Sequence, residues 1–138
     1  MTTVKAKLNN YRQSPRKVRL VADLIRGKMV ERAMQELRFV NKKATRAVKK
    51  LLESAVANAK NNNGLKEKDL VLKEIRVDNG STMKRFRAGA RGQAYPLKRR
   101  TSHISIALES VEDSVNQEKK SNLSKKSKDS SEELELKK

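Results

Sequence analysis

Apolar residues follow two spacings along the chain, first that of helices and then that of strands. Residues 3–11 alternate weakly and predict a short strand. Three segments with helical spacing follow, the first opened by Ser14-Pro15, an N-cap residue before a proline, and closed by Gly27. The third ends at Asn61-Asn62-Asn63-Gly64. The apolar stripes of the three expected helices are Val18, Val21, Ala22 and Ile25; Val30, Ala33, Met34 and Leu37; and Ala44, Val48, Leu51, Leu52, Ala55, Val56 and Ala59.

From Leu70 onward the spacing is that of strands. Val71, Lys73, Ile75 and Val77 share one face, imperfectly, and residues 103–108 alternate cleanly. The 26 residues from 78 to 103 have almost no aliphatic side chains. A loop of that length is rare inside a compact domain and usually carries function.

This segment has the composition of an RNA-binding surface. Residues 79–108 contain no acidic residue. Basic side chains neutralise phosphates, glycine allows close backbone approach, and an aromatic ring can stack on an unpaired base. The relevant residues are Lys84, Arg85, Arg87, Arg91, Lys98, Arg99, Arg100 and His103, together with Gly80, Gly89, Gly92, Phe86 and Tyr95.

Two geometries are compatible with the segment. Asp78-Asn79-Gly80 is typical of a tight hairpin turn, which would leave residues 81–100 as a basic loop. Alternatively, two strands continue together and turn near Ala88-Gly89-Ala90, with arms of about ten residues that project roughly 30 Å. A two-stranded ribbon of that length has no core of its own and is marginal in water until a ligand packs around it.

Charge assigns the binding role to the first 110 residues. The chain has 138 residues, enough for one domain, and a formal net charge of +18. Residues 1–110 hold 27 basic and nine acidic residues, whereas residues 111–138 hold seven of each. We expect 1–110 to be a polyanion-binding domain, with the protruding hairpin at about 78–103, and 111–138 to be a disordered charged tail.

Other classes of protein fit less well. The chain has no cysteine and one histidine, and neither a nucleophile–base pair nor a ligand cluster is apparent, so we expect no enzyme, metal or cofactor. No run approaches the about 18 apolar residues of a membrane span, and no basic helix has a Trp/Phe-rich opposite face, so we expect a cytoplasmic protein without membrane binding. A helix-turn-helix DNA reader over 14–39 is the main rival, but Glu31 and Glu36 lie on its second helix.

Four segments resemble one family. Ser14–Lys28, Leu52–Ala59, Met83–Phe86 and Lys98–Ile104 are similar to the first helix, the long helix and the two hairpin arms of the bacterial-type large-subunit ribosomal protein L twenty-two family. The resemblance covers residues 3–109. It implies an α+β fold, with three helices packed on a small antiparallel sheet and a long protruding β-hairpin. It also implies a structural constituent of the large ribosomal subunit that binds 23S rRNA, aids its assembly and lines the nascent-peptide exit tunnel.

The resemblance carries over to individual residues. At the tip, Ala88-Gly89-Ala90 stands where Pro-Arg-Ala is common in the family, and Tyr95-Pro96 precedes Leu97. The implied partners are large-subunit ribosomal RNA, neighbouring ribosomal proteins and the nascent peptide, with no small-molecule substrate. The implied RNA-binding residues are Arg16, Lys17, Arg19, Lys84, Arg85, Phe86, Lys98, Arg99, Arg100, Thr101, Ser102 and His103, and the implied tunnel tip is Arg87, Ala88, Gly89, Ala90, Arg91 and Gly92.

Overall fold

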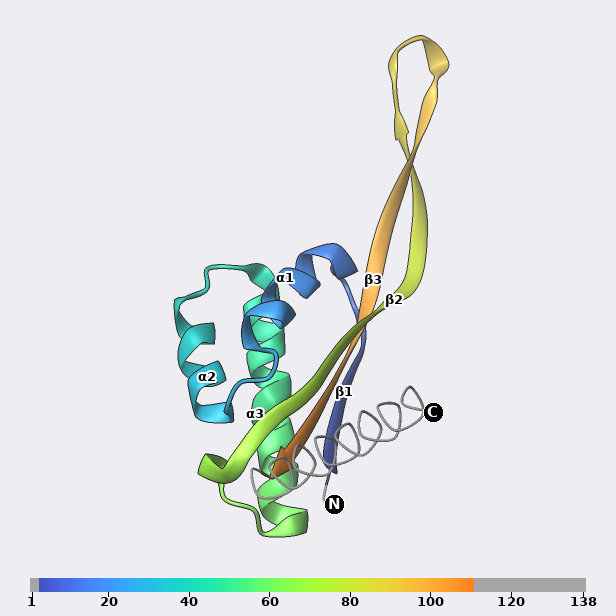
Figure 1. The fold of residues 1–138 in the computed structure, drawn as a ribbon. Helices are drawn as coiled ribbons and strands as arrows, with labels where there is room; N and C mark the ends of the chain where they lie inside the picture. Colours follow the sequence, from blue (N-terminus) through green and yellow to red (C-terminus); the bar gives the residue numbers. More distant parts are fainter. Residues whose placement is uncertain (1–2, 111–138) are drawn as a thin grey trace, which may run out of the picture.

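The fold is α+β, with three helices packed on a three-stranded antiparallel sheet and one hairpin that projects far beyond them (Figure 1). The structure, a computed structural model, describes residues 3–110. The tail expected to be disordered, 111–138, lies outside these residues. The elements are β1 (Thr3–Tyr11), α1 (Pro15–Ile25), α2 (Val30–Phe39), α3 (Lys43–Asn63), β2 (Leu70–Ala88) and β3 (Ala94–Ser110), with short 3-10 turns η1 (Glu67–Asp69) and η2 (Ala90–Gly92).

The core lies between the helices and one face of the sheet. The apolar stripes expected from the sequence supply it, since Val18, Ile25 and Leu52 are completely buried against Ile106 and Leu108 of the central strand, β3. Met34 and Val56 are only partly buried at its margin. The predicted helices and their inward faces are therefore confirmed. Within residues 3–110 no helix has both the length and the apolarity that a membrane span requires.

The ends of the helices follow the sequence signals in part. Gly64 has φ +63°, and its N–H donates to the carbonyl of Lys60 at 3.1 Å while the N–H of Leu65 donates to Ala59 at 3.3 Å, which closes α3 as expected. Ser14 does occupy the N-cap position of α1, but its side chain makes no capping hydrogen bond. Proline at the next position already presets the first turn, so α1 begins there without the hydroxyl.

A bulge in β2 corrects the predicted inward face of that strand. Leu70 and Leu72 point into the core, as do Ile75 and Val77, whereas Val71 and Lys73 do not. The pairing with β3 shifts between Leu72 and Glu74, so that one extra residue is inserted there. Because the side-chain period of a strand is two, one inserted residue exchanges the faces. The imperfect alternation in the sequence marks this bulge.

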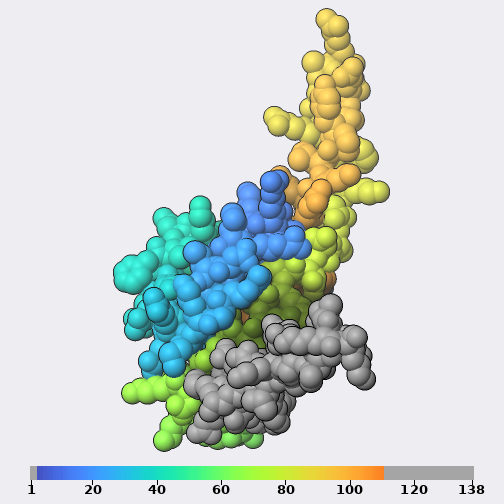
Figure 2. Space-filling view, viewed as in Figure 1, coloured from blue at the N-terminus to red at the C-terminus, as the bar shows by residue number. Residues whose placement is uncertain are grey.

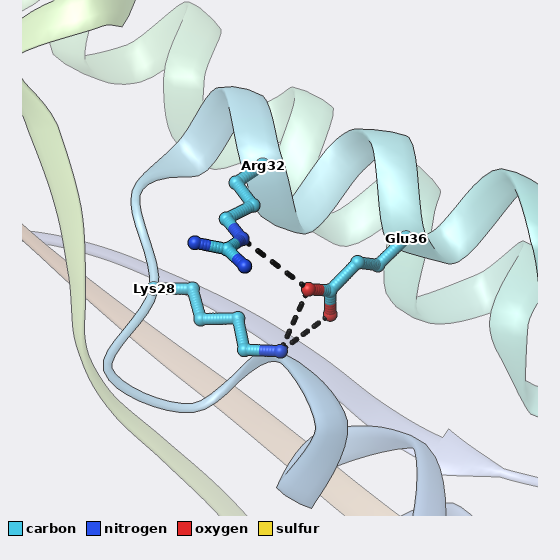
Figure 3. Close-up of polar contacts among 3 residues, drawn as sticks. All are labelled: Lys28, Arg32 and Glu36. Atoms are coloured by element: carbon cyan, nitrogen blue, oxygen red, sulfur yellow. Dashed lines mark hydrogen bonds and ion pairs between the residues drawn. The ribbon is translucent and has the colours of Figure 1, made fainter.

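The connection between α1 and α2 is fixed to β2. The N–H of Gly27 donates to the carbonyl of Leu72 at 3.2 Å, and the N–H of Leu72 donates to that of Lys28 at 3.0 Å. The ammonium of Lys28 lies 2.7 Å from both carboxylate oxygens of Glu36 on α2, and Arg32 approaches the same group at 3.7 Å (Figure 3). This connection holds the two helices in place against the sheet.

The core predicts a simple contrast between two leucines. Leu52→Ala should lower the free energy of unfolding by about 2–5 kcal/mol, because the fully buried side chain leaves a cavity. Leu20→Ala, at a position 62% exposed on α1, should change it by no more than about 0.5 kcal/mol. Urea denaturation of both variants measures the difference. Equal losses would mean that the outer face of α1 is covered in solution.

Candidate nucleic-acid interface

The protruding hairpin consists of β2 and β3 alone. The last residue of β1, Tyr11, pairs with Ser102, and beyond that point no third strand among residues 3–110 pairs with β2 or β3. They remain paired from Thr82 and Arg100 out to Ala88 and Ala94, and the chain turns through residues 89–93. The long ribbon is thus the geometry adopted, and Asn79-Gly80 lies within a strand instead of forming the turn. In the space-filling view the hairpin stands clear of the body (Figure 2).

The basic side chains of the hairpin are exposed and lack acidic partners. All positions from 81 to 88 and from 90 to 100 are exposed. Among residues 3–110 the ion pairs belong to the body, for example Asp23 with Arg26 and Lys49 with Glu53, and none includes a cation of the hairpin. Seven positive charges therefore lie along a thin ribbon. Like charges directly opposed on two strands destabilise the pairing, as at Lys84 and Lys98, so bound anions would stabilise the hairpin.

The two faces of the hairpin differ in chemistry, because directly paired residues share a face and neighbouring pairs alternate between faces. On one face each pair combines an arginine with an apolar or aromatic residue. On the other, the lysines are paired with each other. We call these the arginine face, with Met83–Arg99, Arg85–Leu97 and Arg87–Tyr95, and the lysine face, with Thr82–Arg100, Lys84–Lys98 and Phe86–Pro96.

The root of the hairpin contains a second bulge. Two residues of β2, Gly80 and Ser81, face Thr101 of β3, and the Thr101 hydroxyl donates to the carbonyl of Ser81 at 2.8 Å. A Cβ on Gly80 would overlap Thr101 Oγ1 and lie 3.1 Å from the Thr101 carbonyl carbon. Thr101 is 3% exposed and Ser102 is fully buried, with no hydrogen-bond partner for its hydroxyl. The structure thus places these two expected RNA contacts inside the root, where they position the hairpin.

His103 also holds the root. Its Nδ1 accepts the backbone N–H of Asn10 at 3.2 Å, and Asn10 adopts a left-handed conformation with φ +54°. The regular pairing of β1 with β3 is interrupted at this point, between Leu8 and Tyr11. The half-buried imidazole therefore connects the end of β1 to the base of the hairpin.

The three expected site residues of α1 have different environments. Arg16 and Lys17 are exposed on the first turn of α1. The start of α1 lies near the root of the hairpin (Figure 1). Arg19 instead donates from Nε and Nη2 to the carbonyl of Val77, at 3.2 and 2.9 Å. That pair of hydrogen bonds attaches α1 to β2 just before the root. The structure thus brings α1 and the hairpin together, as the expected site requires.

The basic surface extends further than the sequence predicted. Tyr11, at the root, donates its hydroxyl to the carbonyl of Lys43 at 3.3 Å, and burial raises the pKa of Tyr11. The first turn of α3 therefore lies beside the root, with the exposed cations Lys42 and Lys43 at its start. Arg12, also exposed, directly follows β1. The sequence analysis did not include these residues in the site. Basic residues at the end of a helix are equally typical of a surface that only contacts solvent. Of these residues only Arg12 directly follows a strand in the sequence, and that position was the available signal.

The tip is closed by backbone and side-chain bonds. The N–H of Gly89 donates to the carbonyl of Gln93 at 2.7 Å, and the hydroxyl of Tyr95 donates to Oε1 of the same glutamine at 3.0 Å. Arg91 and Gly92 both have positive φ, at +56° and +72°. The expected tip residues 87–92 thus lie together at the end of the ribbon. In the part of the chain that is described, no group of three or more potential metal-ligating side chains occurs.

The chain matches one protein family. Residues 6–109, well over half of the chain, match the family described as ribosomal protein L22p/L17e. The matched range includes all three helices and both arms of the hairpin.

The crowding at Gly80 predicts a local effect. Gly80→Ala should destabilise the root by about 1–3 kcal/mol, because its Cβ would displace Thr101. Amide exchange at residues 79–82 and 100–103 should accelerate while that of α3 is unchanged. Asn79→Ala, at an exposed neighbouring position, is the matched control. Unchanged exchange in Gly80→Ala would show that the root does not depend on this close approach.

Proposed function

Since the chain belongs to the ribosomal protein L22p/L17e family, we propose that it binds 23S ribosomal RNA of a bacterial-type large subunit, aids its assembly and lines the peptide exit tunnel with its hairpin tip. Membership of the family itself makes the chain a structural constituent of the large ribosomal subunit, in the cytoplasm, with ribosomal RNA and other ribosomal proteins as partners. The role is structural, and no catalytic group is required for it.

The exposed cations of the hairpin carry the proposal. A ribbon without acids, without a third strand and without a core gains stability when anions surround it on both faces. A straight duplex presents its phosphates to one side of such a ribbon at a time, whereas a folded RNA can enclose it. RNA recognition through shape, phosphate and unpaired bases matches the side chains present.

The choice of 23S RNA and of the bacterial type rests on sequence resemblance. Ser14–Lys28 forms α1 and the start of the connection that is fixed to β2, and Met83–Phe86 lies on the outward arm of the hairpin. These are the segments that resemble the bacterial-type proteins. The exposed cations at Arg12, Arg16, Lys17, Lys42 and Lys43 give the body its own RNA contacts around the root.

The thinness and reach of the hairpin support a place for its tip in the tunnel wall. Its paired arms extend about 26 Å past the last residue of β1, from Ser102 to Ala94. A body bound at the subunit surface could therefore send the tip between RNA segments toward an internal passage. The exposed Arg87 and Arg91 would then face RNA, a nascent peptide or both.

Charge removal on the hairpin tests RNA binding. We expect weaker salt dependence when Lys84, Arg99 and Arg100 are replaced by Ala. For a large-subunit RNA fragment, the negative slope of log Kobs against log salt should become shallower by about 2–3, since each lost cation removes roughly one phosphate contact. Incorporation into reconstituted subunits should fall in parallel. The helix content measured by circular dichroism should stay the same, because these residues touch no part of the core.

Lys60, Lys66 and Lys68 provide the matched control. They are exposed, and they lie around the end of α3 and the following turn, away from the hairpin. Replacing these three by Ala removes the same charge. If both triple variants lose binding equally, only the net charge matters and the hairpin is not the principal contact.

Deleting residues 87–92 tests the tunnel assignment. The shortened hairpin keeps the root and the pairs from 82 to 86, so incorporation into the subunit should remain near normal. Progress of nascent chains through the tunnel should change, as measured by ribosome pausing on a set of defined peptides. Normal incorporation with unchanged pausing on every peptide would remove the tip from the tunnel wall.

A further inference from the structure

Tyr95 packs against Gly89 at the end of the hairpin. A Cβ on Gly89 would overlap Cε2 of the ring, lie 3.0 Å from Cδ2 and lie 3.2 Å from the carbonyl oxygen of Gln93. Gly89 has φ −116° and ψ −178°, an extended conformation that any residue can adopt. The backbone conformation therefore does not require glycine at this position. The close approach of the Tyr95 ring does, because it leaves no room for a Cβ. Within residues 81–100, Gly89 is also the one residue that is partly buried.

The ring is held in place and remains open to solvent. Its hydroxyl donates to Gln93 Oε1 at 3.0 Å, so that Tyr95 is restrained both at the ring and at the hydroxyl. Even so, the residue is 56% exposed. An aromatic ring fixed on one side and accessible on the other is preorganised for stacking, because little side-chain entropy is lost when a planar ligand binds.

The neighbours of Tyr95 fit a planar, uncharged ligand better than a phosphate. Arg87 is its cross-strand partner, and Leu97 follows it on the arginine face. A shallow hollow lined by these residues and by Ala88, Gly89 and Pro96 lies at the same place. Tyrosine and leucine offer apolar surface, and a guanidinium can stack on a base or reach its edge. The lysine face, with Lys84 opposite Lys98, presents two ammonium groups and suits phosphates.

We propose that Tyr95, seated on Gly89 and flanked by Arg87, is a stacking platform for an unpaired RNA base. The inference rests on the proposed RNA-binding function and adds a division of labour: the arginine face holds a base at the tip, and the lysine face holds phosphates. Gly89 is a positioning residue, since it acts only through the ring.

Two strands with equal numbers of phosphates separate the two kinds of contact. The full chain is titrated with an oligoadenylate and with an abasic strand of the same length. Wild type should prefer the oligoadenylate, and Tyr95→Ala should weaken that complex about 5- to 100-fold while leaving abasic binding unchanged. Tyr95→Phe should keep most of the preference, because the ring remains.

The lysine face supplies the matched control. Lys84→Ala combined with Lys98→Ala should weaken both strands by the same factor and lower the salt dependence of both. If the lysine variant weakens both strands but Tyr95→Ala does not alter the preference for bases, the stacking inference fails while RNA binding stands. If the wild-type chain binds neither strand, the proposed RNA-binding function fails, and the inference fails with it.

Tyrosine emission gives a direct readout of the ring. The chain has two tyrosines and no tryptophan, so Tyr11→Phe leaves Tyr95 as the only emitting residue. Oligoadenylate should quench this emission, and the abasic strand should not. Quenching by a peptide with none by RNA would assign the ring to a protein ligand and overturn the inference.

Gly89→Ala tests whether the packing of the Tyr95 ring on Gly89 matters, without removing a group that could contact RNA. It should reduce the preference for oligoadenylate, because the new methyl group displaces Tyr95. Combined with Tyr95→Ala it should have no further effect, as expected for two residues that act as one unit. An equal effect of Gly89→Ala in both backgrounds would show that the glycine does not act through Tyr95.

Discussion

Strand β1 ends at the root of the hairpin, and the rest of the structure depends on the position of this strand end. From Ser102 to its end, the central strand β3 has a neighbouring strand on each side and helices against one face. From Ser102 toward the tip, β2 and β3 pair only with each other within residues 3–110. A two-stranded ribbon buries too little apolar surface to offset the entropy of ordering its chain. The protein therefore consists of a body that is stable by its own packing and an extension that depends on what surrounds it.

The root joins these two parts and sets the direction of the extension. Gly80 permits the close approach of Thr101, Ser102 is buried, and His103 accepts a hydrogen bond from the end of β1. Arg19 attaches α1 to β2 immediately below. The hydrogen bonds among these contacts, from Asn10 to His103 and from Arg19 to Val77, are directional. A ribbon whose base is fixed in this way can project along a defined line even though its tip has no support from the body.

Part of the acidic charge of the body is already paired within the body. Carboxylates such as Glu36 and Glu53 lie beside cations of their own helices or connection, so they compete less for the cations of the hairpin. The hairpin thus remains available to RNA, the polyanion with which proteins of this family assemble. Its two faces then allow different contacts, with ammonium groups on one and arginine beside apolar or aromatic residues on the other.

Much of the fold could be predicted because its signals are local. The helical stripes, the closing glycine of α3 and the alternation of 103–108 each depend on neighbours within a few residues, and the structure confirms them. The basic composition of residues 79–100 likewise indicated the hairpin as the segment for which RNA binding is proposed. The limits of the strand were harder to predict, because Asn79-Gly80 has the local chemistry of a turn. Only the register with β3 shows that the strand continues through these residues, with a bulge at Gly80 and Ser81.

The sequence by itself determined the apolar stripes, the acid-free segment and the class of partner, since all three follow from residue types and their spacing. Tertiary structure alone decided which cations remain exposed and which, like Arg19, bond to the body. It also decided that Thr101 and Ser102 are buried and that Tyr95 rests on Gly89. The physical reason is that these contacts join residues of separate strands, or of a helix and a strand, and they exist only once β2 and β3 are paired in one register.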